Sequence, residues 1–394
     1  MHGSRSSERG LRRALRAEEE LALRAAATSE RRRAAAPRLR ALLDVVDWDA
    51  LLADLEYQRM LPLLGGRILE IATDRAPPAF AAAVHQRTAA ARDVGALLEL
   101  TTLRVATALE AADVPNVPLK GPVLARALHG DPGMRHSRDI DVLVARADLG
   151  GAADAVAELG WRRKDDHVAE PVLHTTLVHD AGLPDVELHW RVHWYEAEFG
   201  ARALERAMPA PDGVRRLRPL DELAVLMLVQ ARDGFAGLRH PTDIAAWWDA
   251  HGAAAGPPTL EPILEAHPAL YRALTASAAL LEMVVGIPAA RLVRMPSHLP
   301  WGLRRAIAMA NPLMRGEPQQ VTAEVSLVDG LLSPKGERLA FVRRRVLADA
   351  RDLPAGAAAR PLTLARAEHV VRVLRRYALA VARPSPRLTR ADEP

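Results

Sequence analysis

The sequence predicts an α+β fold in which a small mixed sheet is embedded between N-terminal and C-terminal helical regions. Apolar residues recur at helical spacing before about residue 112 and again beyond residue 220. Between these regions, the run 186–192 alternates polar and apolar residues, which is the period of a half-buried strand, and Asp139–Val144 begins with the same alternation. We therefore expect four segments: a basic, frayed or helical extension over 1–40, a helical lead-in over 41–114, an α/β core over 115–217 and a helical region over 218–394.

The lead-in region shows two apolar faces followed by a long helix. Trp48, Leu51, Leu52 and Leu55 share one helical face, and residues 61–71 supply another. The pair Pro77-Pro78 separates these faces from an alanine- and leucine-rich helix that continues to about residue 112. These residues are typical of packing and carry no chemistry of their own.

The core region alternates strands and helices. We expect helices over 122–128 and 149–159, the second ending at Gly160, which fits a C-cap. Asp180 to Leu183 reads as a hairpin turn between two strand-like runs. The expected strands are 117–119, Asp139–Val144, 173–178 and 186–192.

The C-terminal region returns to helical periodicity. Pro219 opens an apolar helix whose acidic first turn suits the helix dipole. No run of 18 uncharged apolar residues exists, because the best candidate, 269–287, contains Arg272 and Glu282, so we expect no membrane span. The absence of cysteine and of an apolar leader suits a cytoplasmic protein. Further helices are expected over 242–250, 260–285, 303–309, 337–350 and 364–381.

Two carboxylates stand at strand spacing in the core. Because alternate residues of a strand point to the same face, Asp139 and Asp141 project together while Ile140, Val142 and Val144 face a core. Such a pair can hold a divalent metal ion. On the run 186–192, Glu187 shares a face with His189, and Glu187 becomes a third carboxylate if this strand lies beside Asp139–Val144.

Cationic residues precede the two aspartates. Lys120-Gly121 stands before a helix that begins at Pro122, and the free N–H groups of a first helical turn favour an anion. Arg135 and Arg138 lie in the loop before the acidic strand and could bind further phosphate oxygens. A phosphate site beside a metal site is the arrangement that phosphoryl or nucleotidyl transfer requires.

Two other polar patterns are the histidine pair at 189 and 193 and the aspartate at 243. His189 and His193 form H-x-x-x-H, but the alternation around them indicates a strand, so a helical zinc site is disfavoured and His189 is expected to support Glu187. Asp243, in the run 240–244, fits helix N-capping, because an aspartate side chain can accept hydrogen bonds from the free N–H groups of a first turn.

The pattern LKG, apolar helix, arginine and SRDIDVLV, followed by VELHW at residues 186–190, resembles the bacterial uncharacterised nucleotidyltransferase family of the DNA polymerase beta-like superfamily. The resemblance implies an enzyme that uses two Mg²⁺ ions, or Mn²⁺, to move a nucleoside monophosphate from an NTP to an acceptor with release of pyrophosphate. It also implies catalytic and metal-binding roles for Asp139, Asp141 and Glu187. Asp243 resembles an acidic position in the family's helical region, and helix N-capping explains this aspartate equally well. Lys120, Gly121, Arg135 and Arg138 would then bind the nucleotide phosphates. One departure is Pro122, which has neither the N–H nor the hydroxyl that many superfamily members carry there.

The charge distribution bears on the acceptor. The formal net charge of the whole chain is +4. Residues 1–40 carry 11 basic and 5 acidic side chains, and residues 360–394 carry 8 basic and 3 acidic ones. The two ends therefore hold a net charge of +11, and residues 41–359 have a net charge of −7. A nucleic-acid groove needs clustered positive charge. The acidic middle therefore favours a small-molecule, sugar, peptide or protein acceptor over a polynucleotide.

Two alternatives from other classes remain at this stage. A metal-dependent nucleotide-sugar glycosyltransferase also uses D-x-D, but its motif follows an α/β nucleotide-binding half, whereas the preceding residues here read as helical. The other alternative is an antitoxin-like binding protein that keeps the fold without turnover. The sequence sets neither the oligomeric state nor the preferred base.

Overall fold

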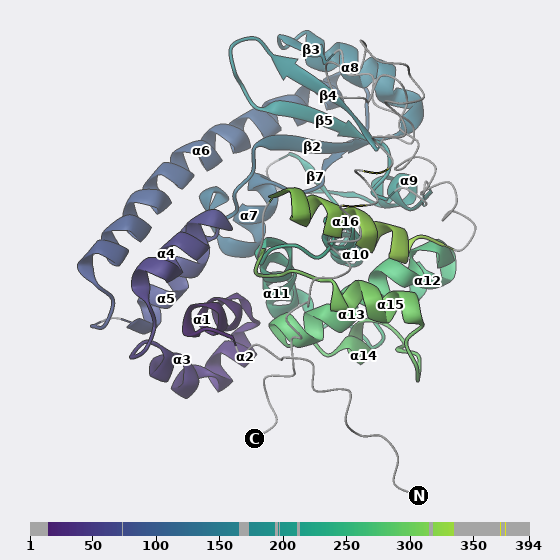
Figure 1. Ribbon diagram of the computed structural model, residues 1–394. Coiled ribbons are helices and arrows are strands. Elements are labelled where there is room, and N and C mark those ends of the chain that lie inside the picture. The colour runs from purple at the N-terminus through teal and green to yellow at the C-terminus, as the bar shows by residue number, and fades with distance from the viewer. Residues whose placement is uncertain are drawn as a thin grey trace, which may run out of the picture.

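The computed structural model describes residues 15–72, 74–164, 173–193, 196, 198–210, 213–314 and 318–334, together with Val371 and Arg375. It confirms the expected α+β class, with helices on both sides of a mixed sheet in the chain order. Figure 1 shows the sheet at the top of the view, the N-terminal helices at the lower left and the C-terminal helices at the lower right. The helices expected over 337–350 and 364–381 lie outside the described residues, apart from Val371 and Arg375, which are helical.

The main sheet has five strands in the order β1-β2-β5-β4-β3. Strand β2 pairs parallel with β5, and the other neighbours are antiparallel. The expected pairing of the two acidic strands is therefore present, with Asp141 opposite Glu187. Strand β3 was not expected from the sequence. The strand bounds are β1 Asn116–Pro118, β2 Asp139–Val144, β3 Trp161–Arg163, β4 His174–His179 and β5 Asp185–His189.

One face of this sheet is apolar and packs on two helices. Ile140, Val142 and Val144 of β2 join Val186 and Leu188 of β5 in a buried cluster with residues of α6, Pro78–Ala111, and α8, Leu149–Ala157. Every one of these five strand residues is at most 1% exposed. The alternation of β2 and β5 therefore turns their other residues to the opposite face.

The connection from β1 to β2 carries most of the expected phosphate site. Helix α7, Pro122–His129, is followed by the 3-10 turn η2, Pro132–Met134. The backbone of η2 meets α6 without an intervening side chain: a Cβ on Gly95 would lie 2.6 Å from the Gly133 nitrogen, and a Cβ on Gly133 would lie 2.6 Å from the Ala91 carbonyl oxygen. Glycine at both positions allows this close approach.

The N-terminal helices form a second, larger hydrophobic cluster together with the C-terminal helices. The long helix expected after Pro77-Pro78 is α6. The segment 61–71, expected to be helical, contains a short π-helix, η1, before α5. The remaining bounds are α1 Ala17–Ala26, α2 Ser29–Ala34, α3 Ala36–Leu42, α4 Trp48–Tyr57, η1 Leu61–Gly65 and α5 Gly66–Ala72.

Between residues 198 and 334, the described residues form helices, their connecting loops and one short hairpin of β6 and β7. The stretch 260–285, expected as one helix, is divided because His267 leaves the helical conformation (φ −133°, ψ 69°) before Pro268, as residues preceding proline tend to do. The bounds are η3 Arg146–Asp148, α9 Glu198–Glu205, β6 Met208–Pro209, β7 Arg215–Arg216, α10 Pro219–Arg232, α11 Arg239–His251, α12 Glu261–Ala266, η4 Pro268–Leu270, α13 Tyr271–Val285, α14 Ala289–Leu292, α15 Trp301–Ala308 and α16 Pro318–Leu332.

One described stretch has the length and composition of a membrane-spanning helix. It covers Pro268–Val285, and 61% of it is buried inside the protein. A core helix of a globular fold has the same character, so this stretch is weak evidence for a span.

Candidate active site

Three carboxylates converge on the polar face of the sheet. Asp139 and Asp141 project from β2, and Glu187 projects from the adjacent strand β5 in register with Asp141. One oxygen of each side chain lies within 4.8 Å of the other two. This distance is short enough for one cation to contact all three groups. The sheet register thus brings together the three residues that the sequence grouped.

Asp141 is the most buried of the three and has a cationic partner. Its side chain is 1% exposed, and its Oδ2 lies 3.0 Å from Lys120 Nζ. Burial on its own would raise the pKa of Asp141, but the Lys120 ammonium and a hydrogen bond from His189 hold that pKa well below its ordinary value. Asp141 is therefore ionised at neutral pH.

Asp139 has a different electrostatic setting. Burial and the neighbouring Asp141 carboxylate raise the pKa of Asp139. Two carboxylates this close repel each other unless a cation lies between them. The pair therefore favours a bound cation.

His189 lies between two of the carboxylates, as a supporting residue would. Its Nε2 is 2.9 Å from Asp141 Oδ1 and 3.2 Å from Glu187 Oε2. A proton on Nε2 can be donated to either carboxylate. Burial would raise the pKa of Glu187, but this hydrogen bond lowers it, so Glu187 is also ionised at neutral pH.

His174 completes the polar face and was missed by sequence reasoning. It stands opposite His189 in the β4–β5 pairing, and its Nε2 is 3.5 Å from Glu187 Oε1. His174, Glu187 and His189 form a second group whose ligand atoms lie within 4.8 Å of one another. The hairpin turn after His179 fixed this register and could have revealed the residue. Neither metal-ligand group found among the described residues includes His193.

Lys120 and Gly121 occupy the turn between β1 and α7. Gly121 has a φ of 89°, a conformation that favours glycine, and it is the residue before the first helical position, Pro122. Ser137 Oγ would lie 3.7 Å from a Cβ at Gly121. The structure therefore places the start of α7 and the loop before β2 beside the acidic residues.

Arg135 is buried and forms an ion pair. Its Nε donates to Asp243 Oδ2 at 2.7 Å and its Nη1 donates to Ser137 Oγ at 3.0 Å, while His129 Nε2 is 3.1 Å from Asp243 Oδ1. Asp243 lies inside α11, so the N-capping explanation for this aspartate is wrong. The pairing shows that Arg135 ties the loop before β2 to α11. Its contact with a phosphate stays a prediction.

Arg138, the other arginine of the phosphate prediction, is exposed and directly precedes β2. Among the residues that the structure describes, it has no carboxylate within ion-pair distance, in contrast to Arg135. Its side chain is therefore available to an anionic ligand.

The donor atoms fit the expected metal. Asp139, Asp141 and Glu187 offer only oxygen ligands, which Mg²⁺ prefers and for which Mn²⁺ also has affinity. Asp141 is held ionised by Lys120 and His189, and the neighbouring Asp141 carboxylate destabilises the ionised form of Asp139. The residues present therefore suit a divalent cation.

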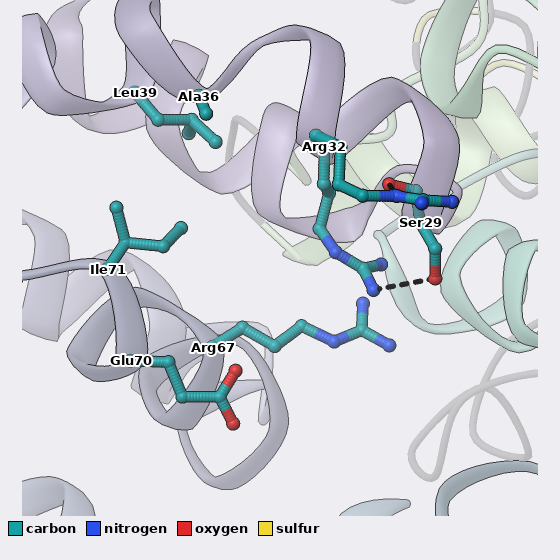
Figure 2. Close-up of a pocket in the computed structure, with 8 residues that line it drawn as sticks. Ser29, Arg32, Ala36, Leu39, Arg67, Glu70 and Ile71 are labelled. Atoms are coloured by element: carbon teal, nitrogen blue, oxygen red, sulfur yellow. Dashed lines mark hydrogen bonds between the residues drawn. The ribbon is translucent and has the colours of Figure 1, made fainter.

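A separate cavity lies among the N-terminal helices. It has a volume of about 370 Å³ and is lined by Ser29, Arg32, Arg33, Ala36, Leu39, Arg67, Glu70 and Ile71. Figure 2 shows Arg32 and Arg67 approaching each other there, with Arg32 hydrogen-bonded to Ser29. None of the carboxylates or histidines of the sheet lines this cavity.

The fold and the site define a class of protein in which a mixed sheet presents an Asp-x-Asp pair and a third carboxylate on one face, beside a lysine and the start of a helix. The family described as uncharacterised nucleotidyltransferase matches residues 44–281, and the chain belongs to this family. The match supports a general nucleotidyltransferase role with a nucleotide substrate. No curated protein and no solved structure matched the chain.

Proposed function

We propose that this protein is a Mg²⁺-dependent nucleotidyltransferase that moves a nucleoside monophosphate from an NTP to a small-molecule, sugar, peptide or protein acceptor and releases pyrophosphate. The observation that carries the proposal is the convergence of Asp139, Asp141 and Glu187 within 4.8 Å, with Lys120 on Asp141. The family supports the reaction class. The metal, the acceptor and the site residues are parts of the proposal.

In this proposal the three carboxylates hold the metal, which when bound neutralises phosphate charge and lowers the pKa of the attacking group. Glu187 is ionised at neutral pH and is placed to take up the acceptor's proton or to serve as a ligand, depending on the substrate pose. His189 holds the Asp141 and Glu187 carboxylates in a fixed relation to each other.

Lys120 has two roles in turn. In the free protein its ammonium neutralises Asp141 at 3.0 Å. If a bound cation neutralised Asp141, Lys120 would be free to contact the phosphates that the turn at Gly121 and the start of α7 would position.

The net charge of the middle of the chain supports the proposed class of acceptor. Residues 41–359 have a net charge of −7. A polynucleotide would be repelled by that balance unless a local basic groove overcame it. A small or peptidic acceptor suits the site better, and a cytoplasmic location is proposed with it.

The experiment that tests the function combines the purified protein with Mg²⁺, each α-labelled NTP in turn and cell extract as a source of acceptor. Pyrophosphate release together with transfer of label to an acceptor is expected. A parallel reaction with UDP-sugars tests the glycosyltransferase alternative, and label-free acceptors with intact nucleotide binding would identify a non-catalytic binding protein.

The matched control is Asp141→Asn, which keeps the shape of the side chain and removes its charge. Transfer by the wild type and none by this variant supports the proposal. Equal transfer by both proteins would exclude Asp141 from the reaction and with it the metal site proposed here.

A further inference from the structure

Three arginines and a histidine lie beside the carboxylates and come from three separate parts of the chain. Arg59 follows α4, His136 and Arg138 belong to the loop before β2, and Arg239 begins α11. We call these four residues the arginine cluster. The sequence patterns singled out only Arg138 of these four, and Arg59 and Arg239 are separated from it by long stretches of chain.

The contacts within the cluster centre on His136. Arg59 Nη1 is 2.8 Å from His136 Nε2, and Arg239 Nη1 is 3.5 Å from the His136 carbonyl oxygen. Burial and the charge of Arg59 lower the pKa of His136 to about 4. His136 is therefore neutral at pH 7, and its Nε2 can accept a hydrogen bond from Arg59.

The positive charge of the cluster is poorly balanced. Among the described residues, Arg59 and Arg138 have no carboxylate within ion-pair distance, and Arg239 has only Asp233, whose Oδ2 is 4.0 Å from Nη2. Burial and Arg138 lower the pKa of Arg59, and burial and Arg135 lower that of Arg239, although arginine stays charged. Like charges gathered without partners favour an anion between them.

The cluster also lies next to the metal-binding carboxylates. Arg138 is the residue before Asp139, and the charge of Asp139 acts on Arg239. All three arginines keep contact with solvent, and the Arg239 side chain is 37% exposed. A ligand that reaches Asp139 would therefore come within range of these guanidinium groups.

The backbone at Arg59 indicates that this side chain is held there at a cost. Arg59 has a φ of 57° and occupies the position after the end of α4 that usually belongs to glycine. The hydrogen bond from Met60 N to Leu55 O, at 2.8 Å, is the one that this helix ending requires. Glycine would end the helix with less strain, whereas Arg59 at this position places a guanidinium group beside His136.

We propose that the arginine cluster binds a multiply charged phosphate group, with Arg59 and Arg239 as binding residues contributed by the two helical regions. The inference rests on the proposed function, because it places a phosphate group beside the site of transfer. The phosphate group has two sources: the β- and γ-phosphates of the NTP, or a phosphate on the acceptor. Both present the same chemistry, which the fork of arginine recognises.

The test is titration of the purified full chain with tripolyphosphate by isothermal calorimetry in the absence of divalent metal. The variants are Arg59→Gly and Arg239→Gln, and the control is Arg104→Gln, which replaces an exposed arginine of α6. We expect each cluster variant to weaken binding by about tenfold or more, since each loses a charge-assisted hydrogen-bond donor. The control should bind as the wild type does.

The choice of glycine at residue 59 separates binding from folding. Arg59→Gly relieves the left-handed strain, so the melting temperature should stay the same or rise while anion binding falls. Arg59→Lys keeps the charge and should recover part of the affinity. A wild type that does not bind tripolyphosphate, or cluster variants that bind it within twofold of the wild type, would overturn the proposal.

A competition experiment distinguishes the two sources. If an NTP displaces tripolyphosphate, the cluster holds the nucleotide tail; if both bind together, it holds a phosphate of the acceptor. The same titration on Asp141→Asn separates this inference from the proposed function. Loss of binding in the cluster variants without NTP turnover in any protein would reject the transfer reaction and leave the anion site standing.

Discussion

The two faces of the central sheet differ in their side chains and contacts, although the residues of the two faces alternate along the same strands. On one face, Ile140, Val142, Val186 and Leu188 pack against α6 and α8, where apolar side chains of the right shape are all that is required. On the other face, Asp139, Asp141, Glu187 and His189 are partly or fully buried and would be costly there without partners. Lys120 and His189 offset that cost through short contacts. The comparison teaches that one face holds the sheet in place and the other carries the proposed site.

The largest expected effect comes from the polar face. Asp141→Ala should abolish nucleotidyl transfer, by a hundredfold or more, because it removes a central electrostatic contact. Pyrophosphate release measures the loss, and circular dichroism with a thermal melt checks that the fold survives. Wild-type turnover by the folded Asp141→Ala variant would show that the polar face does not carry the transfer reaction.

The next effect concerns the contact that ties the polar side to α11. Asp243→Ala should destabilise the protein by about 3–5 kcal/mol, because it leaves the Arg135 guanidinium buried without its carboxylate. Chemical denaturation measures the change. The double variant with Arg135→Met should recover much of the stability, and a double variant as unstable as the single one would show that the pair itself is not the cause.

On the apolar face, Leu177→Ala should cost about 2–4 kcal/mol of folding free energy, because the side chain is fully buried and leaves a cavity. Transfer activity per folded molecule should stay near that of the wild type. A large fall in that specific activity at a temperature where the protein is folded would show that the two faces are coupled.

The smallest effect tests a half-buried acid outside both faces. Burial raises the pKa of Glu222, in the first turn of α10, to about 7, while Arg216 opposes the shift. Because the folded state then binds a proton more tightly than the unfolded chain, stability should fall as the pH rises from about 4.5 to about 7. Glu222→Gln should remove this slope and add about 1–3 kcal/mol at pH 8. Denaturation curves from pH 4.5 to 8 measure it, and an unchanged slope would exclude Glu222 as its source.

Local patterns in the sequence predicted much of the site. The bounds of Asp139–Val144 were correct, since an Asp-x-Asp alternation followed by an unbroken apolar run is typical of a strand whose later residues are buried on both faces. The pairing with β5 placed Glu187 opposite Asp141, as expected. The expected strand over 186–192 was too long: the strand ends at His189. Sequence patterns alone do not reveal where a partner strand ends.

Residues brought together by long-range packing could not be predicted in this way. Arg59 and Arg239 are 180 residues apart in the chain and meet around His136 only through the packing of the helices. Arg135 was expected to face phosphate, and its partner Asp243 lies 108 residues further along. In a chain with so many arginines, composition does not distinguish a paired side chain from a free one. His174 was within reach of prediction, because the hairpin register alone places it opposite His189.

The backbone contact between Gly95 of α6 and Gly133 of η2 has a consequence for ligand capture. Two main chains that touch directly leave no flexible side chain to absorb movement, so the segment that begins at η2 is braced by a helix of 34 residues. The backbone that carries Arg135 and Arg138 is then fixed before any ligand arrives, so little backbone entropy would be lost if the proposed phosphate group bound there. A side chain added at either glycine should therefore impair recognition without removing a single charged group.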